Sequence, residues 1–253
     1  MGMKWDSRGY DEGFSFVSRY GEALLDLVGA GPGASCLDLG CGTGTLAGKL
    51  AARGLSVVGM DSSPEQLARA RETHPDIEFV QADATDFSLD EPVDVVFSNA
   101  VLHWIDRDDQ PRALACVARA LRPGGELVFE MGGAGNNALT HRALAEAFAR
   151  HGLPYEVPFY FPTIGEYASL LEGAGLTPTF ATLFERPTPL ADGADGMARW
   201  IRMFPRRPFV GVPDELASRI VDEAVEALEP ELMRDDGTWV SDYVRLRMRC
   251  IRR

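Results

Sequence analysis

Apolar and polar positions along the first half of the chain follow two alternating patterns. Five short apolar runs, each bounded by glycine, proline or polar residues, have the length of buried strands: 35–39, 56–60, 77–81, 93–98 and 126–131. Three intervening segments carry apolar residues at helical spacing: 45–53, 64–72 and 110–121. Strands that alternate with helices are typical of a parallel sheet with helices on both faces. We therefore expect a doubly wound α/β fold.

The second half of the chain is less regular. Helical spacing continues over 138–151 and 164–174, and a further strand is expected at 177–184. Residues 190–238 then hold two helical stretches joined by the sequence PRRPFVGVP, which predicts a helical cap inserted before the last strand. Strand character returns at 244–250, where apolar residues alternate with arginines. That alternation is typical of an antiparallel strand near a sheet edge.

The amino-terminal region, residues 1–30, is expected to cover the sheet. Apolar residues recur at helical spacing over 16–28, which predicts an amphipathic helix there. A chain of 253 residues is long enough to bury one substantial core. We therefore expect residues 1–253 to form a single domain around a mostly parallel sheet of seven strands.

The charge balance limits the partners of this chain. Its 25 Lys and Arg residues face 38 Asp and Glu residues, a formal net charge of −13, which opposes nucleic-acid binding because phosphates are neutralised by basic side chains. No apolar run approaches the length of a membrane span, so no membrane partner is expected. Four cysteines without a Cys-x-x-Cys pair, and a start without an apolar signal core, favour a cytoplasmic protein without a metal site. A small-molecule substrate remains, while the oligomeric state has no signal in the sequence.

A glycine-rich turn, LDLGCGTG at residues 37–44, follows the first strand and opens the next helix. Gly40 and Gly42 allow the backbone to bend sharply and to approach a ligand closely, and the amides at a helix N-terminus favour an anion. The turn alone fits a dinucleotide pyrophosphate as well as other cofactors. Asp38 changes this picture, because its carboxylate would repel a pyrophosphate and attract a cationic amino group.

Two further acids follow the next two strands. Asp61 stands about 20 residues after the first glycine, where a carboxylate reaches ribose hydroxyls, and Asp83 lies where a side chain and the next amide can contact the amino edge of an adenine. With these acids, residues 21–131 resemble a class I S-adenosylmethionine-dependent methyltransferase. The resemblance implies a Rossmann-like methyltransferase fold and S-adenosylmethionine as methyl donor.

The resemblance also implies which residues hold the cofactor. These are Asp38, Gly40 and Gly42 at the methionine end, Asp61 and Ser62 along the ribose, Asp83 and Ala84 at the adenine, and Asn99 beneath the methionine moiety. More narrowly, the runs VFSNAVLHW and PGGELVFEMGG are similar to small-molecule methyltransferases of the trans-aconitate methyltransferase type. The acceptor atom is then expected to belong to a carboxylate, a hydroxyl or an activated carbon.

Several further residues are candidates for binding or activating the methyl acceptor. His103, after the fourth strand, is a candidate general base, although it would equally well shape the pocket. On the substrate side, Tyr10 is a candidate for an aromatic lid that excludes water, and Trp104 is a candidate pocket wall. Arg199 is a candidate for binding a substrate carboxylate through two hydrogen bonds. Two other interpretations stay open: an NAD-dependent oxidoreductase, supported by the same turn and Asp61, and a non-catalytic S-adenosylmethionine-binding partner protein.

Overall fold

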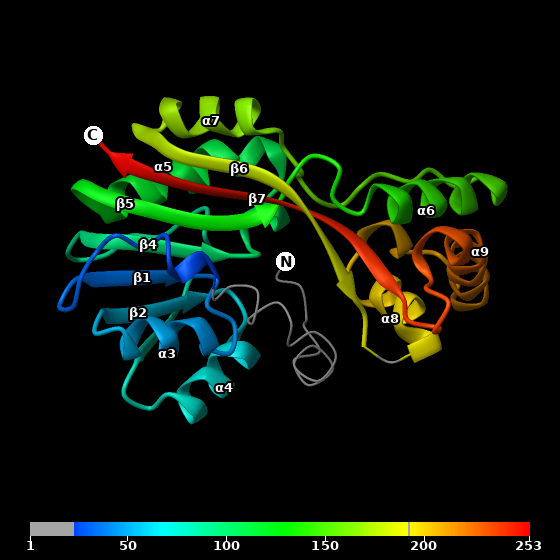
Figure 1. Ribbon diagram of the computed structural model, residues 1–253, viewed down its shortest axis with the longest axis horizontal. Coiled ribbons are helices and arrows are strands. Elements are labelled where there is room, and N and C mark those ends of the chain that lie inside the picture. Colours follow the sequence, from blue (N-terminus) through cyan, green and yellow to red (C-terminus); the bar gives the residue numbers. More distant parts are fainter. Residues whose placement is uncertain (1–22, 192) are drawn as a thin grey trace.

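One mixed sheet organises the molecule. The computed structural model describes residues 23–191 and 193–253, and seven strands of these residues form the sheet in the order β3-β2-β1-β4-β5-β7-β6 (Figure 1). Strands β1 to β5 run parallel, whereas β7 runs antiparallel to both of its neighbours. The strands are β1 (Ser35–Leu39), β2 (Ser56–Asp61), β3 (Glu78–Gln81), β4 (Val93–Asn99), β5 (Leu121–Gly132), β6 (Leu176–Pro189) and β7 (Val240–Arg252). The predicted doubly wound, mostly parallel fold with seven strands is confirmed.

Helices cover both faces of this sheet, because its central strands are apolar on both sides. Two helices and the buried Leu24 and Leu25 pack against one face, and two other helices pack against the opposite face (Figure 1). The first pair is α3 (Thr45–Ala52) and α4 (Pro64–Thr73), and the second pair is α5 (Gln110–Ala120) and α7 (Ile164–Gly173). The predicted helix at 16–28 lies largely outside the described residues, which begin within a helical turn at 23–25.

Local sequence explains where α4 and α7 begin. The Ser63 hydroxyl accepts a hydrogen bond from the Gln66 amide at 3.2 Å, and Pro64 occupies the first helical position, as the sequence predicts. Thr163 caps α7 in the same way, because its hydroxyl accepts from the Glu166 amide at 3.2 Å. Both helices therefore begin at fixed points next to strand ends.

A helical lobe lies beyond the sheet (Figure 1), and it contains its own apolar core. It is built from α6 (Ala138–Arg150), α8 (Gly196–Met203) and α9 (Asp214–Leu232). The helices α8 and α9 lie between β6 and β7 in the chain, where the sequence predicts an inserted cap. The sequence does not predict that α6 packs with them, and its Leu144 and Phe148 are fully buried in the same core. Four short 3₁₀ helices complete the described structure: η1 (Leu102–Trp104), η2 (Arg107–Asp109), η3 (Gly193–Asp195) and η4 (Arg207–Phe209).

The last two strands form a long hairpin that joins the lobe to the sheet. Pairing between β6 and β7 extends from Leu176 opposite Arg252 to Pro189 opposite Val240. As the sequence predicts, β7 is antiparallel, and it lies one position in from the edge, which β6 occupies. The arginines of β7 therefore face side chains of β5 instead of an open edge.

Candidate active site

The carboxyl ends of β1, β2 and β4 open into a cleft of about 570 Å³. This is the edge of a parallel sheet where ligands are usually bound. Most of the cofactor residues expected from the sequence line the cleft: Gly40, Gly42, Asp61, Ser62, Asp83, Ala84 and Asn99. The topology therefore brings together residues that are spread over about 60 positions of the chain.

The glycine turn leaves β1 in a backbone conformation that L side chains rarely adopt. Gly40 has a φ of 74°, and a Cβ there would lie 2.2 Å from a methyl carbon of Val101. Gly42 has a φ of 54°, and a Cβ there would meet no atom within 4 Å. Gly40 is thus required by the close approach of Val101, whereas Gly42 keeps its side of the cleft open for a ligand.

Asp38 does not line the cleft and lies behind the turn. It is 2% exposed, and its Oδ2 atom has no hydrogen-bond partner among the described residues. Burial and the nearby charge of Asp61 raise the pKa of Asp38 to about 7, although the Ala47 amide opposes the shift. A buried carboxyl group with one unpartnered oxygen fits a cationic ligand such as the ammonium group of a methionine moiety.

Asp61 and Asp83 are held by backbone amides at the mouth of the cleft. Asp61 accepts from the amides of Gly42 and Ser63, each at 2.9 Å, and burial nevertheless raises its pKa. Asp83 accepts from the amide and hydroxyl of Thr85 at 2.8 and 2.7 Å, and these bonds lower its pKa. Both carboxyl groups keep further acceptor capacity for ligand hydroxyl or amino groups.

The segment after β4 crosses the floor of the cleft. Asn99 ends the strand, and Ala100, which also lines the cleft, has a φ of 61°. A positive φ is unfavourable for alanine and is held here by the hydrogen bond from its amide to the Glu130 carbonyl, 2.8 Å long. The sequence carries no signal for this conformation, because alanine does not favour it.

His103 lies on η1, beside the cleft-lining Trp104. Its ring is 8% exposed, and Nδ1 accepts a hydrogen bond from the Gly132 amide at 3.3 Å. Since a backbone N–H can only donate, the ring proton is placed on Nε2. Burial and the positive charge of Arg245 hold the pKa of His103 well below its usual value, so the ring is neutral near pH 7.

The cap reaches the opposite side of the cleft. Arg206, Arg207 and Val210 contribute to its lining, and Arg207 forms an ion pair with Asp106 of the segment after β4. Arg199, expected to contact substrate, lies on α8 and is not among the residues that line this cleft. Tyr10, the other acceptor-side candidate, lies outside the described residues.

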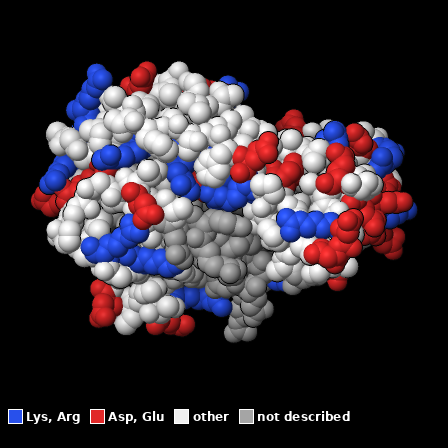
Figure 2. Space-filling view, viewed as in Figure 1, with Lys and Arg blue, Asp and Glu red and all other residues white. Residues whose placement is uncertain are grey.

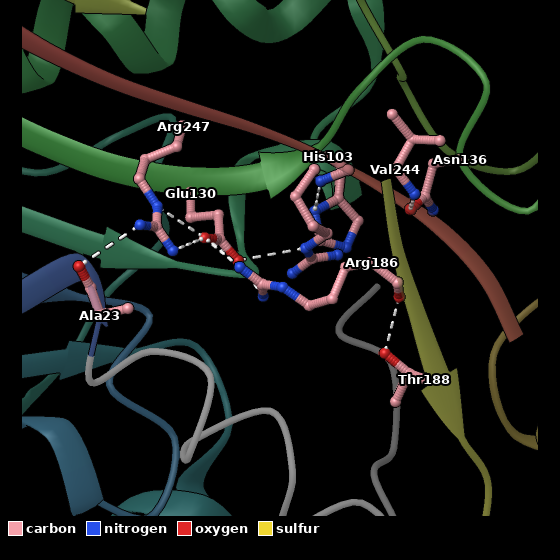
Figure 3. A network of polar contacts seen from close by, with 10 residues as sticks. Ala23, His103, Glu130, Asn136, Arg186, Thr188, Val244 and Arg247 are labelled. Atoms are coloured by element: carbon pink, nitrogen blue, oxygen red, sulfur yellow. Dashed lines mark hydrogen bonds and ion pairs between the residues drawn. The ribbon is translucent and has the colours of Figure 1, made fainter. Parts of the chain in front are cut away.

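Three arginines surround Glu130 in an arrangement that the sequence does not predict, and we call it the Glu130 cluster (Figure 3). Arg186 donates to both oxygens of this carboxylate at 2.6 and 2.8 Å, Arg245 donates through Nε at 3.3 Å, and Arg247 donates through Nε and Nη2 at 2.9 and 2.6 Å. The Glu130 side chain is fully buried, and those of the arginines are 10–13% exposed. As a result the pKa of Glu130 lies below its usual value, because these charged partners outweigh the effect of burial.

Lys and Arg side chains gather near the centre of the face shown in Figure 2, whereas acidic side chains are prominent on the helical lobe.

Comparison with known proteins matches the first half of the chain to a family model. Residues 36–125, which carry the cleft-lining turn and strand ends, match the model described as a methyltransferase domain. The chain is 30% identical to an uncharacterized methyltransferase of Schizosaccharomyces pombe, over 96% of each protein. It is also 30% identical to a trans-aconitate 2-methyltransferase of Azoarcus sp., over 98% of this chain and 99% of the relative.

A solved structure shows the same fold. A phosphoethanolamine N-methyltransferase of Haemonchus contortus, in complex with phosphomonomethylethanolamine and S-adenosylhomocysteine, superposes with a TM-score of 0.58. The match covers 92% of this chain and 52% of that one, at 19% sequence identity. At this identity the likeness concerns the fold.

Proposed function

Because this chain belongs to the S-adenosylmethionine-dependent methyltransferases, with S-adenosylmethionine as methyl donor, we propose that its acceptor is a carboxylate of a small molecule. One observation carries the choice of acceptor: the lone pair of His103 Nδ1 is occupied by the Gly132 amide. The histidine therefore presents an N–H group and no free base. Carboxylates are ionised near pH 7 and need no base before they accept a methyl group.

The residues that line the cleft, and Asp38 behind them, fit the donor. Asp38 supplies a buried negative charge for the ammonium group, and Asp61 has acceptor capacity for the ribose hydroxyls. Asp83 and Ala84 lie at the mouth, where the adenine edge is expected. When bound, S-adenosylmethionine supplies a sulfonium methyl group, which a carboxylate oxygen accepts to give a methyl ester and S-adenosylhomocysteine without transfer of a proton. These roles remain proposals for each residue.

The protein's own contribution is alignment and exclusion of water. We propose that the neutral His103 donates through Nε2 to an acceptor oxygen, since none of the described residues accepts from that atom. Trp104 and Phe159, whose ring centroids lie 4.8 Å apart edge to face, form an apolar wall beside it. A hydroxyl or carbon acceptor would instead need a base, and the fixed tautomer of His103 argues against that role.

The relatives support this choice of acceptor class. Trans-aconitate, named in the relative from Azoarcus sp., is a polycarboxylate.

We propose that residues 1–253 form one catalytic domain in which the 190–238 insertion covers the cleft, because Arg206 and Val210 of that insertion line it. None of the helices in the described part of the chain is long and apolar enough to cross a bilayer. A cytoplasmic location and the absence of a nucleic-acid partner belong to the same proposal, supported by four free cysteines and the net charge of −13.

The linkage formed in the product tests the proposal. The purified chain is incubated with methyl-labelled S-adenosylmethionine and a panel of small carboxylates, phenols and amines, and the labelled products are then treated with alkali. We expect label in carboxylate products only, and its release as methanol by alkali, because methyl esters are hydrolysed under these conditions. Label that survives alkali would identify an ether, amine or carbon acceptor and contradict the proposal.

A further inference from the structure

We propose that the Glu130 cluster binds a second anionic group of the acceptor and thereby selects small molecules with two or more negative charges. This inference rests on the proposed function, because the first carboxylate is the one that receives the methyl group. It assigns the selection to Arg245 and Arg247, whose guanidinium groups are held in place by Glu130. Figure 3 shows Glu130 between Arg186 and Arg247.

The cluster lies one strand away from the donor cleft. Glu130 is paired with Asn99 in the register of β4 and β5, and the Asn99 side of this pair lines the cleft. His103 connects the two regions, because its ring accepts from Gly132 at the end of β5 and its pKa is lowered by the charge of Arg245. His103 thus lies close enough to Arg245 to feel its charge, and the proposal places a small acceptor beside His103 next to these guanidinium groups.

The charges of the cluster do not balance within the described residues. Even with Arg186 left out of the count, the guanidinium groups of Arg245 and Arg247 share the single carboxylate of Glu130, and no other described carboxylate contacts them. Their side chains are only 10 and 13% exposed, so water screens this excess positive charge poorly. An anionic group of a ligand would offset the excess positive charge of the cluster. It would also interact favourably with the positive charge of the sulfonium donor.

Arg245 has donors left for such a ligand. Among the described residues it donates a hydrogen bond only through Nε, so both of its terminal nitrogens remain available. Its guanidinium lies 5.6 Å from the ring centroid of Tyr243, which limits its movement. A planar guanidinium held in this way matches a carboxylate through two parallel hydrogen bonds.

Arg249, on the same strand, forms an ion pair with a structural role. It donates to Glu126 at 2.6 Å, one arginine to one glutamate. The other oxygen of Glu126 accepts from the amides of Gly29 and Ala30 at 2.7 and 2.9 Å, so this carboxylate ties down a loop. The pair lies toward the far end of β5 from the cleft, and its charges balance. Arg249 is therefore the matched control for Arg245 and Arg247.

Binding without turnover tests the proposal. Calorimetric titrations with S-adenosylhomocysteine present compare trans-aconitate and a panel of di- and tricarboxylates with crotonate, a monocarboxylate. We expect at least one polycarboxylate to bind the wild-type chain about tenfold or more tightly than crotonate, a difference of about 1.4 kcal/mol, because a second carboxylate adds charged hydrogen bonds. In Arg245→Lys and Arg247→Lys that preference should fall about tenfold, while Arg249→Lys retains it.

The outcomes separate the two proposals. Equal binding of polycarboxylates and crotonate, no binding by any polycarboxylate, or equal losses in all three variants would overturn the assignment of the cluster. Unchanged melting temperature and S-adenosylhomocysteine affinity confirm that each variant is folded. If polycarboxylates bind selectively but no alkali-labile methyl ester forms, the proposed function fails while the anion site stands.

Discussion

Asp38 links donor binding to protonation in a way that can be measured. With a pKa of about 7, this carboxyl group is protonated in about nine tenths of the molecules near pH 6 and in about one tenth near pH 8 before the donor binds. The ammonium group of the donor needs the ionised form. Donor affinity should therefore rise about tenfold, or about 1.4 kcal/mol, between these pH values.

Donor affinity should rise with pH because the pKa of Asp38 is raised. Burial stabilises the protonated form of Asp38, so the proton must leave when a cation binds, and binding near pH 6 should release about 0.9 proton. Calorimetry with S-adenosylhomocysteine, in buffers of different ionisation enthalpy, measures both the affinity and the proton count. The ring of His103 does not compete over this range, because its pKa lies well below its usual value.

Asp38→Asn provides the control. The variant should bind S-adenosylhomocysteine about 10- to 100-fold more weakly near pH 8, the loss expected for one charged hydrogen bond, and its affinity should vary little with pH. An affinity of the wild-type chain that stays flat between pH 6 and pH 8 would refute the argument. So would an equally steep dependence in Asp38→Asn.

Two further predictions concern the turn and the histidine. His103→Ala should lower kcat by less than about tenfold, because a hydrogen-bond donor is lost and not a general base; a loss above about a hundredfold would restore the base interpretation. Gly42→Ala should weaken S-adenosylhomocysteine binding, measured by calorimetry, because its methyl group enters the open cleft at a positive φ. Gly40→Ala should mainly lower the melting temperature, since its Cβ would overlap Val101. Equal effects of both glycine variants on melting temperature and binding would contradict this distinction.

The grouping of the expected donor residues at one edge of the sheet was predictable because its signals are local. A strand ends, a glycine turn or an acid follows, and the parallel topology then places all such positions at one edge of the sheet. Ser63 could be assigned as a helix cap for the same reason, since the cap and its partner Gln66 are three residues apart.

The proposed acceptor side of the site was not predictable, because it is formed by contacts between distant segments of the chain. The alternating arginines of the last strand predict a charged face, but the neighbouring strand that carries Glu130 is set by tertiary register. Glu130 itself stands within the apolar run LVFEM, which gives no sign of a polar partner. In the same way, the amphipathic pattern of α6 identifies an apolar face without saying that the face packs against α9.

The β6–β7 hairpin has a consequence for how such a protein can be altered. Both strands continue from the sheet into the helical lobe. After one register shift between Pro178 and Phe180, their pairing continues to Pro189 opposite Val240. The segment between these two residues therefore begins and ends at neighbouring points of the hairpin. A segment of different length or sequence could be grafted there while the strand ends and the glycine turn keep their geometry. The graft would have to cover the apolar face of α6 and replace the wall that Arg206 and Val210 contribute to the cleft. The hairpin thus makes the lobe exchangeable, so that chimeras could combine one donor cleft with new acceptor pockets.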